Sequence, residues 1–207
     1  MFIILYAISS VDIGKYEKMM SLMGSVFGKT NVSSITAGHG NAIIKKFDIK
    51  DQIGINKELK NQLQDLITSN NLNNSVRLEE NERGITIHIL DEILFPSATA
   101  DLSKGSEGVL GKIAAVIRKL PNDIRVEGHT DNVPIASAQF PSNWHLSVAR
   151  ALNTAYYLIN KEGLPQDKLS IVGYAEYKPV SPNRDARGRS ENRRVDIVIL
   201  KTNDKTE

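Results

Sequence analysis

The sequence is organised around two neighbouring stretches: Gly128-His129-Thr130-Asp131 and, after a polar loop with two prolines, Asn143-Trp144-His145-Leu146-Ser147-Val148-Ala149-Arg150. The first stretch ends a short predicted strand and the second begins a predicted helix. Asn143, Ser147 and Arg150 are spaced i, i+4 and i+7, so they share one helix face. The pattern therefore places an acid, Asp131, close to the start of a helix that carries a base.

This arrangement suits a ligand that is both acid and base. Unpaired backbone N–H groups at the helix start favour an anion, and Arg150 can hold a carboxylate through two hydrogen bonds. Asp131 can then accept an ammonium group of the same ligand. An internal ion pair between Asp131 and Arg150 explains the spacing equally well, so these residues alone leave both interpretations open.

Strands and helices alternate on both sides of this centre. Alternating apolar residues and turn signals predict strands at residues 76–80, 84–90, 124–127, 169–174 and 194–200. Helical spacing predicts helices from about 56 to 69 with Asn56 as N-cap, after Ser103 as N-cap up to Pro121, and from 144 to 162. The expected fold class is α+β, with two helices on one face of a small mixed sheet, preceded by N-terminal helices and a linker.

The N-terminal segments allow two interpretations each. The apolar run of residues 1–10 is too short to cross a bilayer, so it is either a buried or frayed segment or the outer half of a membrane helix. Residues 12–27 form an amphipathic helix that either packs on the protein or lies on a membrane or over a pore. Residues 29–55 have the composition of a flexible connector.

Composition excludes several classes of function. The chain has 207 residues, 26 basic and 24 acidic, for a net charge of +2, and no cysteine. The absence of cysteine removes disulfides, thiolate metal sites and cysteine nucleophiles. The arginines between 184 and 194 lack interleaved aromatic residues, so we expect a solvated loop that enters an edge strand, and no binding of nucleic acid.

No motif indicates a cofactor or catalysis. Residues 105–112 resemble a phosphate loop, but Ser106 replaces the first glycine and Ile113 the metal-binding hydroxyl. His129 and Asp131 have no third metal ligand at a recognisable spacing. We therefore expect no metal, no cofactor and no enzyme activity; a cell-wall hydrolase using His129 and Asp131 is the enzymatic alternative.

Several motifs together resemble the OmpA-like peptidoglycan-binding domain over about residues 85–200: Gly128-His-Thr-Asp131, Asn143-x-x-Leu146-Ser147-x-x-Arg150-Ala151, Gly173-Tyr-Ala, Pro179 and Glu191-Asn-Arg-Arg-Val-Asp196. The resemblance implies a β-α-β-α-β-β domain that binds the diaminopimelate of cell-wall stem peptides without catalysis. The peptidoglycan-binding residues it implies are Asp131, Arg150, Asn143, Leu146, Thr130 and Arg194.

Within this family the sequence is most similar to the MotB type, which anchors the flagellar motor stator to the cell wall. That likeness implies the outer part of a truncated transmembrane helix at 1–11, a plug-like helix at 12–28, a linker and regulatory helix at 29–75, the peptidoglycan-binding domain at 76–200 and a tail at 201–207. It also implies a MotA-like channel subunit as partner, a homodimer, and a single-pass inner-membrane location with the C-terminal domain at the cell wall.

One departure separates the chain from the MotB pattern. MotB membrane helices carry an ion-binding aspartate, whereas residues 1–11 contain no acid. We interpret this as a missing upstream half, which leaves the coupling ion undetermined. The alternative is another OmpA-like envelope protein that tethers the cell wall and has no connection with flagella.

Overall fold

The computed structural model describes residues 49–201, and the side chains of residues 57–201. Its centre is a five-stranded mixed sheet with the order β1-β2-β5-β3-β4. The strands are β1 (Val76–Asn81), β2 (Gly84–Leu90), β3 (Ile124–His129), β4 (Leu169–Gly173) and β5 (Arg194–Leu200). Among these five strands only β3 and β4 are parallel; β5, the last of them in the described sequence, is antiparallel to both β2 and β3.

The three central strands form because their apolar residues alternate with polar ones and meet on one face. Ile85, Ile87 and Ile89 of β2 are buried, and Ile87 pairs with Ile197 of β5. The same face of β5 continues with Val195 and Ile199. Because successive side chains of a strand point to opposite faces, Arg194 and Asp196 are directed to the other side of the sheet.

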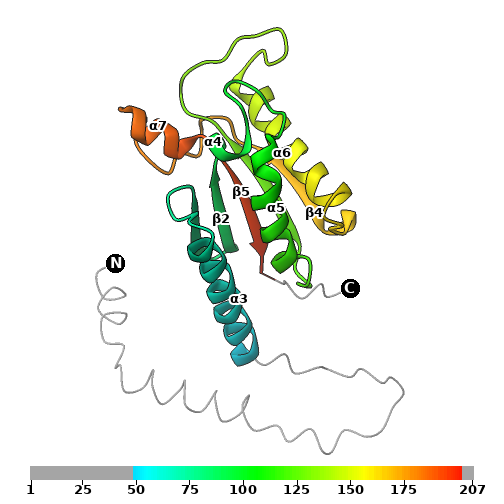
Figure 1. Cartoon of the computed structure of the whole chain (residues 1–207). Helices are drawn as coiled ribbons and strands as arrows, with labels where there is room; N and C mark the ends of the chain where they lie inside the picture. Colours follow the sequence, from blue (N-terminus) through cyan, green and yellow to red (C-terminus); the bar gives the residue numbers. More distant parts are fainter. Residues whose placement is uncertain (1–48, 202–207) are drawn as a thin grey trace, which may run out of the picture. The chain divides into compact units, whose positions relative to one another are not determined.

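Helices cover the apolar face (Figure 1). They are α3 (Ile49–Ser69), α5 (Lys104–Ile117) and α6 (Asn143–Asn160), with the short helices α4 (Asp91–Leu94), η1 (Gln166–Lys168) and α7 (Ala186–Asn192) in the connections. Ser103 caps α5 by accepting a hydrogen bond from Ser106 N at 3.2 Å, as predicted. Leu63 of α3, Leu110 of α5 and Leu158 of α6 all belong to one hydrophobic core.

The predicted fold class is confirmed, with two corrections. The arginine-rich segment is partly the helix α7 and leads into β5, which is a central strand and not an edge strand. Charged residues such as Arg194 and Asp196 occur within this central strand because they lie on the polar face of the sheet. The helix predicted to begin at Asn56 begins at Ile49, since Gly54 costs a helix only about 1 kcal/mol and does not end it.

Other predictions fall outside this part of the chain. The segments predicted at 1–11 and 12–28, most of the linker, and all but the first residue of the tail lie outside the described residues. Among residues 49–201, no helix is both long enough and apolar enough to cross a bilayer. Leu59, Leu63 and Ile67 of α3 are buried in the core that includes the sheet.

Two glycines allow α6 to approach the sheet very closely. Gly128 of β3 and Gly173 of β4 are paired neighbours in the sheet. A Cβ atom on Gly128 would overlap the carbonyl oxygen of Ser147, and a Cβ atom on Gly173 would overlap the side chain of Val148. The backbone of α6 therefore rests directly on β3 and β4, one turn after its start.

We expect Gly128→Ala to destabilise the protein by about 1 to 3 kcal/mol, because the added methyl group meets a backbone carbonyl that cannot turn away. Gly108→Ala is the matched control. Gly108 lies on an exposed position of α5 with no atom within 4 Å of the added Cβ, so this change should stabilise by up to about 1 kcal/mol. Urea denaturation of both variants measures the difference; equal stabilities would contradict the close contact.

Candidate functional site

The loop after β3 is held in place by Asn143 at the start of α6. The side chain of Asn143 accepts a hydrogen bond from Ile135 N at 3.1 Å and donates to Val133 O at 3.1 Å and Asp131 O at 3.3 Å. Asp131 in turn accepts from Val133 N at 3.0 Å through Oδ1. The predicted site residue Asn143 thus fixes the loop that presents Asp131.

Asp131 and Arg150 belong to a cluster of four charged residues, which we call the charge quartet: Asp91, Asp131, Arg150 and Arg193. Arg193 Nη1 donates to Asp131 Oδ2 at 2.8 Å, and Arg150 Nη1 donates to Asp91 Oδ2 at 3.0 Å. Arg193 Nε lies 3.5 Å from the same Asp91 oxygen and joins the two pairs. Acids and bases alternate through the quartet, so its formal charges sum to zero.

The exposed fraction of the four quartet side chains increases from Arg150 to Arg193. The side chain of Arg150 is 3% exposed, those of the two aspartates are 11% exposed, and that of Arg193 is 35% exposed. Arg150 also donates from Nε to Thr99 O at 2.9 Å and lies over the ring of Phe95 at 5.0 Å. Within residues 57–201, the Nη2 groups of Arg150 and Arg193 form no hydrogen bond, so both guanidinium groups retain donors for a ligand.

Burial shifts the proton affinities of the inner pair. It raises the pKa of the Asp91 carboxyl, and the charges of Arg150 and Arg193 oppose that shift without cancelling it. Burial also lowers the pKa of the Arg150 guanidinium, against the opposing charge of Asp91. The pairing with Arg150, together with Arg193, therefore offsets part of the cost of burying the Asp91 carboxylate.

Apart from Asn143, the predicted site residues fall into three groups: Asp131 and Arg150 in the quartet, Thr130 and Leu146 beside the loop, and Arg194. Asp131 and Arg150 lie in one network but do not form the direct ion pair that their spacing allows; Arg193 and Asp91 stand between them. Thr130 is buried and donates its hydroxyl to Asp131 O at 2.9 Å, while Leu146 packs in a small apolar cluster with Ala100 and Phe140. Both residues therefore hold the loop after β3, Thr130 through its bond to Asp131 and Leu146 through the cluster on which Ile135 of the loop packs.

Arg194 lies away from the quartet, on the sheet face opposite the helices. Its Nε atom is 3.1 Å from each carboxylate oxygen of Asp196, and Nη2 donates to Lys178 O at 3.2 Å. The neighbouring Arg193 is the arginine that contacts Asp131. The family motif contains both adjacent arginines and predicted Arg194 as the site residue. Neighbouring residues at a strand point to opposite faces, so the choice between them depends on the position of β5, which the motif does not give.

Sequence reasoning also missed Asp91. It follows β2 directly, and Leu90 of that strand pairs with Arg194 of β5, so Asp91 arrives beside Arg193 only through the pairing of two distant strands. Its one local signal was an acid placed immediately after a strand of buried isoleucines.

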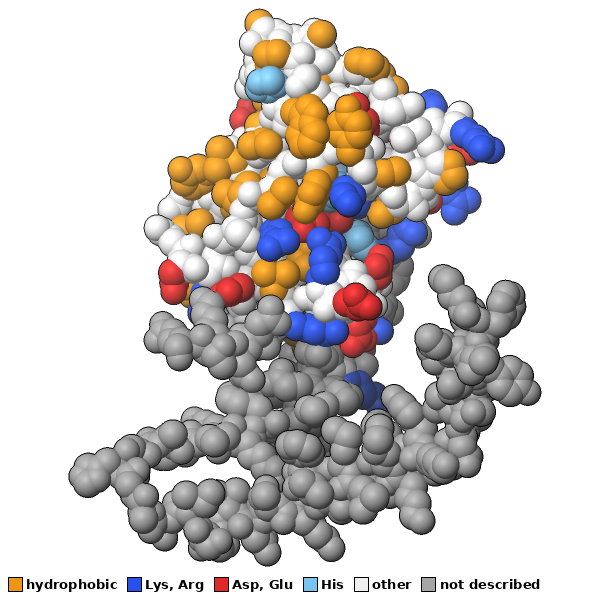
Figure 2. All heavy atoms as spheres, turned by 180° about the vertical axis from the view of Figure 1, so that it is seen from behind, with side chains coloured by type: hydrophobic (Ala, Val, Ile, Leu, Met, Phe, Trp, Pro, Cys, Tyr) orange, Lys and Arg blue, Asp and Glu red, His pale blue; other side chains and the backbone are white. Residues whose placement is uncertain are grey.

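The polar face of the sheet carries a second group of charged residues, which surround a cavity of about 480 Å³. Figure 2 shows basic, acidic and histidine side chains gathered over the middle of this face. Arg83 donates to Glu127 at 2.8 Å, and His88 Nδ1 lies 2.8 Å from Asp196. The ring of His129 stacks on Tyr174 with a centroid distance of 5.3 Å.

Comparison with known proteins relates the chain to cell-envelope proteins. The family model described as the OmpA family matches residues 94–193. Motility protein B of Bacillus subtilis is 34% identical over 97% of this chain and 84% of its own length. YtxE of the same organism, described as uncharacterised, is 33% identical over 97% of this chain and 82% of its own length.

Solved structures share the fold. A MotB-like protein from Desulfovibrio vulgaris superposes with a TM-score of 0.68 at 27% identity, covering 74% of this chain and 98% of that structure. The periplasmic domain of Helicobacter pylori MotB gives a TM-score of 0.58 at 30% identity, covering 63% and 85%. The cell wall anchor of the Pseudomonas aeruginosa T6SS gives 0.61 at 33% identity, covering 66% and 94%.

Stability should depend on pH through His129. Burial lowers the pKa of its imidazole, and Asp196 opposes that shift incompletely. As pH falls below about 6.5 the unfolded chain takes up this proton before the folded protein does, so the His129 contribution is complete above that pH and is lost below it. We expect the free energy of unfolding to fall between about pH 6.5 and 5, with a smaller slope in His129→Gln.

Urea denaturation at several pH values measures this slope. His145→Ala is the control, because it removes an exposed histidine of α6 and should leave the slope as in the parent. An unchanged slope in His129→Gln would assign the pH dependence to other groups.

Proposed function

This chain belongs to the OmpA family, among its MotB-like members, and we propose that it is a non-catalytic anchor that binds peptidoglycan through the charge quartet. The proposed ligand is the diaminopimelate side chain of the stem peptide, which carries an amino and a carboxyl group on one carbon. The single observation that carries the proposal is the alternation of acid and base in Asp91, Asp131, Arg150 and Arg193.

The alternation favours a zwitterion over a simple ion. A ligand with one ammonium and one carboxylate leaves the summed charge of the site at zero, so no unbalanced charge is transferred from water. Each ligand charge also finds an opposite partner within the quartet. A plain cation or anion would satisfy one pair of residues and repel the other.

We place the ammonium group at Asp131 and the carboxylate at Arg193 and Arg150. Asp131 contacts Arg193, the most exposed member of the quartet, so we expect the Asp131 Oδ2 atom that accepts from Arg193 to be reached by an incoming ammonium group. Arg193, the more exposed arginine, then directs its donors to the carboxylate, and Arg150 contributes its Nη2 group from below. Charge-assisted hydrogen bonds of this kind are the strong ones.

The wider role we propose is that of a flagellar stator anchor of the MotB type. The likeness to motility protein B of B. subtilis supports it, because that likeness includes most of the residues before position 49 as well as the folded domain. The role brings with it a MotA-like channel subunit, a homodimer, and an inner-membrane position with this domain outside, all as parts of the proposal.

A second candidate is a cell-wall tether unconnected with flagella. The structural likeness to the T6SS cell wall anchor and a 33% identity to the outer-membrane lipoprotein YfiB over 58% of this chain favour it. Both candidates use the same peptidoglycan site. They differ in what the tether holds.

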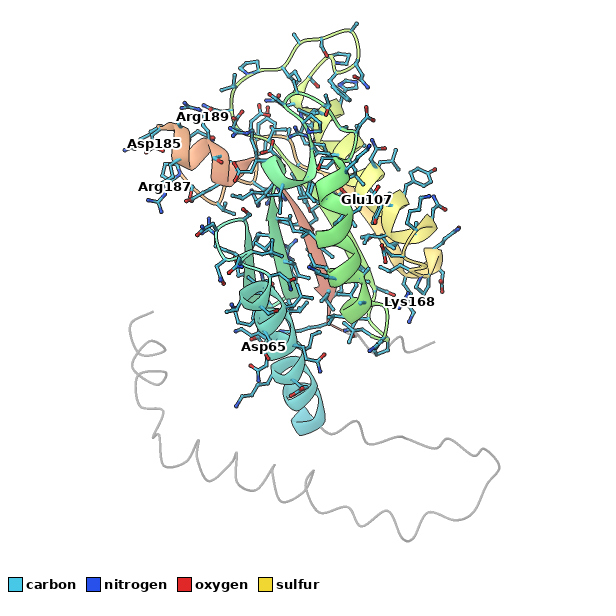
Figure 3. All side chains as sticks on the ribbon, viewed as in Figure 1. Asp65, Glu107, Lys168, Asp185, Arg187 and Arg189 are labelled. Carbon is cyan, nitrogen blue, oxygen red and sulfur yellow. The ribbon has the colours of Figure 1, made fainter. Side chains whose placement is uncertain are left out.

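Binding to purified sacculi tests the site. We expect Arg193→Ala and Asp131→Asn each to weaken binding of the full chain by about 1.5 to 3 kcal/mol, because each removes a charge-assisted contact. Arg187→Ala is the matched control: Arg187 lies on α7 with a side chain 90% exposed, away from α5 and α6 (Figure 3), and its loss should leave binding unchanged.

Arg150 is a poor choice for this test, because its removal leaves Asp91 buried without its main partner at a cost of about 3 to 5 kcal/mol in stability. If Arg193→Ala and Asp131→Asn fold and bind sacculi as tightly as the parent, the quartet is not the site. Sacculi whose stem peptides carry lysine in place of diaminopimelate lack the second carboxylate, and they should retain less protein.

Deleting the gene distinguishes the two candidate roles. A stator anchor predicts cells that assemble flagellar filaments but do not swim, and restoration of swimming by the parent gene but not by the Asp131→Asn form. Normal swimming of the deleted strain favours the tether unconnected with flagella.

A further inference from the structure

The polar face of the sheet holds three buried side chains whose oxygen and nitrogen atoms converge. They are Glu127 and His129 of β3 and Asp196 of β5, each 2% exposed or less. One ligand-type atom from each residue lies within 4.8 Å of the other two. Glu127 and Asp196 are direct partners across the two strands, and His129 is two residues after Glu127, so all three point to the same face.

Among residues 57–201, His129 is the member of this cluster whose ring nitrogens form no hydrogen bond. Nε2 lies 3.3 Å from Asp196 Oδ2 and 3.9 Å from Glu127 Oε2, directed between the two carboxylates without hydrogen-bond geometry to either. A buried polar atom without a partner is costly, so this position favours a bound group that completes it.

The three donor atoms are suited to a metal ion. Zinc binds imidazole nitrogen and carboxylate oxygen at about 2.0 to 2.2 Å, which places neighbouring ligand atoms roughly 3.4 Å apart at tetrahedral angles. His129 Nε2 lies 3.3 Å from Asp196 Oδ2 and 3.9 Å from Glu127 Oε2, and the ligand atoms of the three residues all lie within 4.8 Å of one another, so the cluster is near the size that a bound zinc ion requires. An imidazole among the donors favours zinc or another first-row transition metal over magnesium or calcium.

The surrounding residues hold the carboxylates in position. Arg83 binds Glu127 through Oε1 and leaves Oε2 for the cluster, while His88 binds Asp196 through Oδ1. Carboxylates that ligate metals are commonly fixed by hydrogen bonds of this type. Arg194 Nε also contacts Asp196, but its other two nitrogens bind backbone carbonyls, which keeps the guanidinium in place when Asp196 Oδ2 turns to a metal.

We propose that Glu127, His129 and Asp196 form a binding site for a divalent first-row transition metal such as Zn²⁺. The site lies on the sheet face opposite the helices, so it is distinct from the charge quartet and does not depend on peptidoglycan binding. The three protein ligands leave at least one coordination position open to the adjoining cavity. The positive charges of Arg83 and Arg194 already offset the negative charges of Glu127 and Asp196. The charge of the bound ion is then not balanced by the protein, so we expect moderate affinity and a water molecule or an anion at the open position.

The metal would link two central strands. Glu127 and His129 come from β3 and Asp196 from β5, so binding would hold β3 and β5 together. This is the strand pair that connects β1 and β2 on one side of the sheet with β4 on the other. Since a ligand that binds only the folded state stabilises it, Zn²⁺ should raise the unfolding temperature of the chain.

Calorimetric titration of the metal-free full chain with Zn²⁺ tests the site. We expect one ion per chain with a Kd on the order of micromolar. Glu127→Gln, which preserves the shape of the side chain, and His129→Gln, which removes the imidazole ligand, should each weaken binding on the order of ten-fold or more. Co²⁺ provides an independent readout, because its visible absorption depends on the ligands and should change in both variants.

His145→Ala is the control, since it removes a histidine on α6 outside the cluster and should bind Zn²⁺ as the parent does. A parent chain that takes up no stoichiometric Zn²⁺ overturns the proposal, and so does unchanged affinity in Glu127→Gln. If His129→Gln fails to fold, Glu127→Gln and Asp196→Asn decide the question. Zn²⁺ that binds but gives no rise in unfolding temperature places the ion elsewhere.

Discussion

The contact between α6 and the two glycines that it packs on is the constraint on which the charge quartet depends. Gly128 and Gly173 are side by side in β3 and β4, and together they let the helix backbone rest on the sheet at Ser147. At this contact the hydroxyl of Ser147 accepts a hydrogen bond from Ala175 N at 3.1 Å, which ties the helix to the segment after β4. The start of α6 is thereby fixed beside the end of β3, and Asn143 and Asp131 meet as a result.

The central position of β5 is the second organising feature. Because β5 lies between β2 and β3, the point where the chain enters it serves both faces of the sheet: Arg193, just before the strand, contacts Asp131 and Asp91, and Arg194, its first residue, contacts Asp196. One short segment therefore supplies a base to the quartet and a base to the polar face. The buried side chain of Asn192, which binds Val180 N and Ser181 N, holds the preceding loop against this segment.

The sequence predicted what local patterns determine. The alternation of Ile85, Ile87 and Ile89, the cap at Ser103 and the helical spacing of α6 each depend on nearby residues, and the strands and helices were found where those patterns lie. Asp131 and Arg150 were identified for the same reason. Asp91, Arg193 and the partnership of Glu127 with Asp196 depend on strand order, which joins residues up to about 100 positions apart and has no local signature.

The late position of β5 in the sequence also affects the order in which this domain folds. Without β5 the sheet consists of two separate pairs, β1 with β2 and β3 with β4, which are not hydrogen-bonded to each other. The core therefore cannot close until residue 200 has been synthesised, and a chain with such non-local pairing folds slowly.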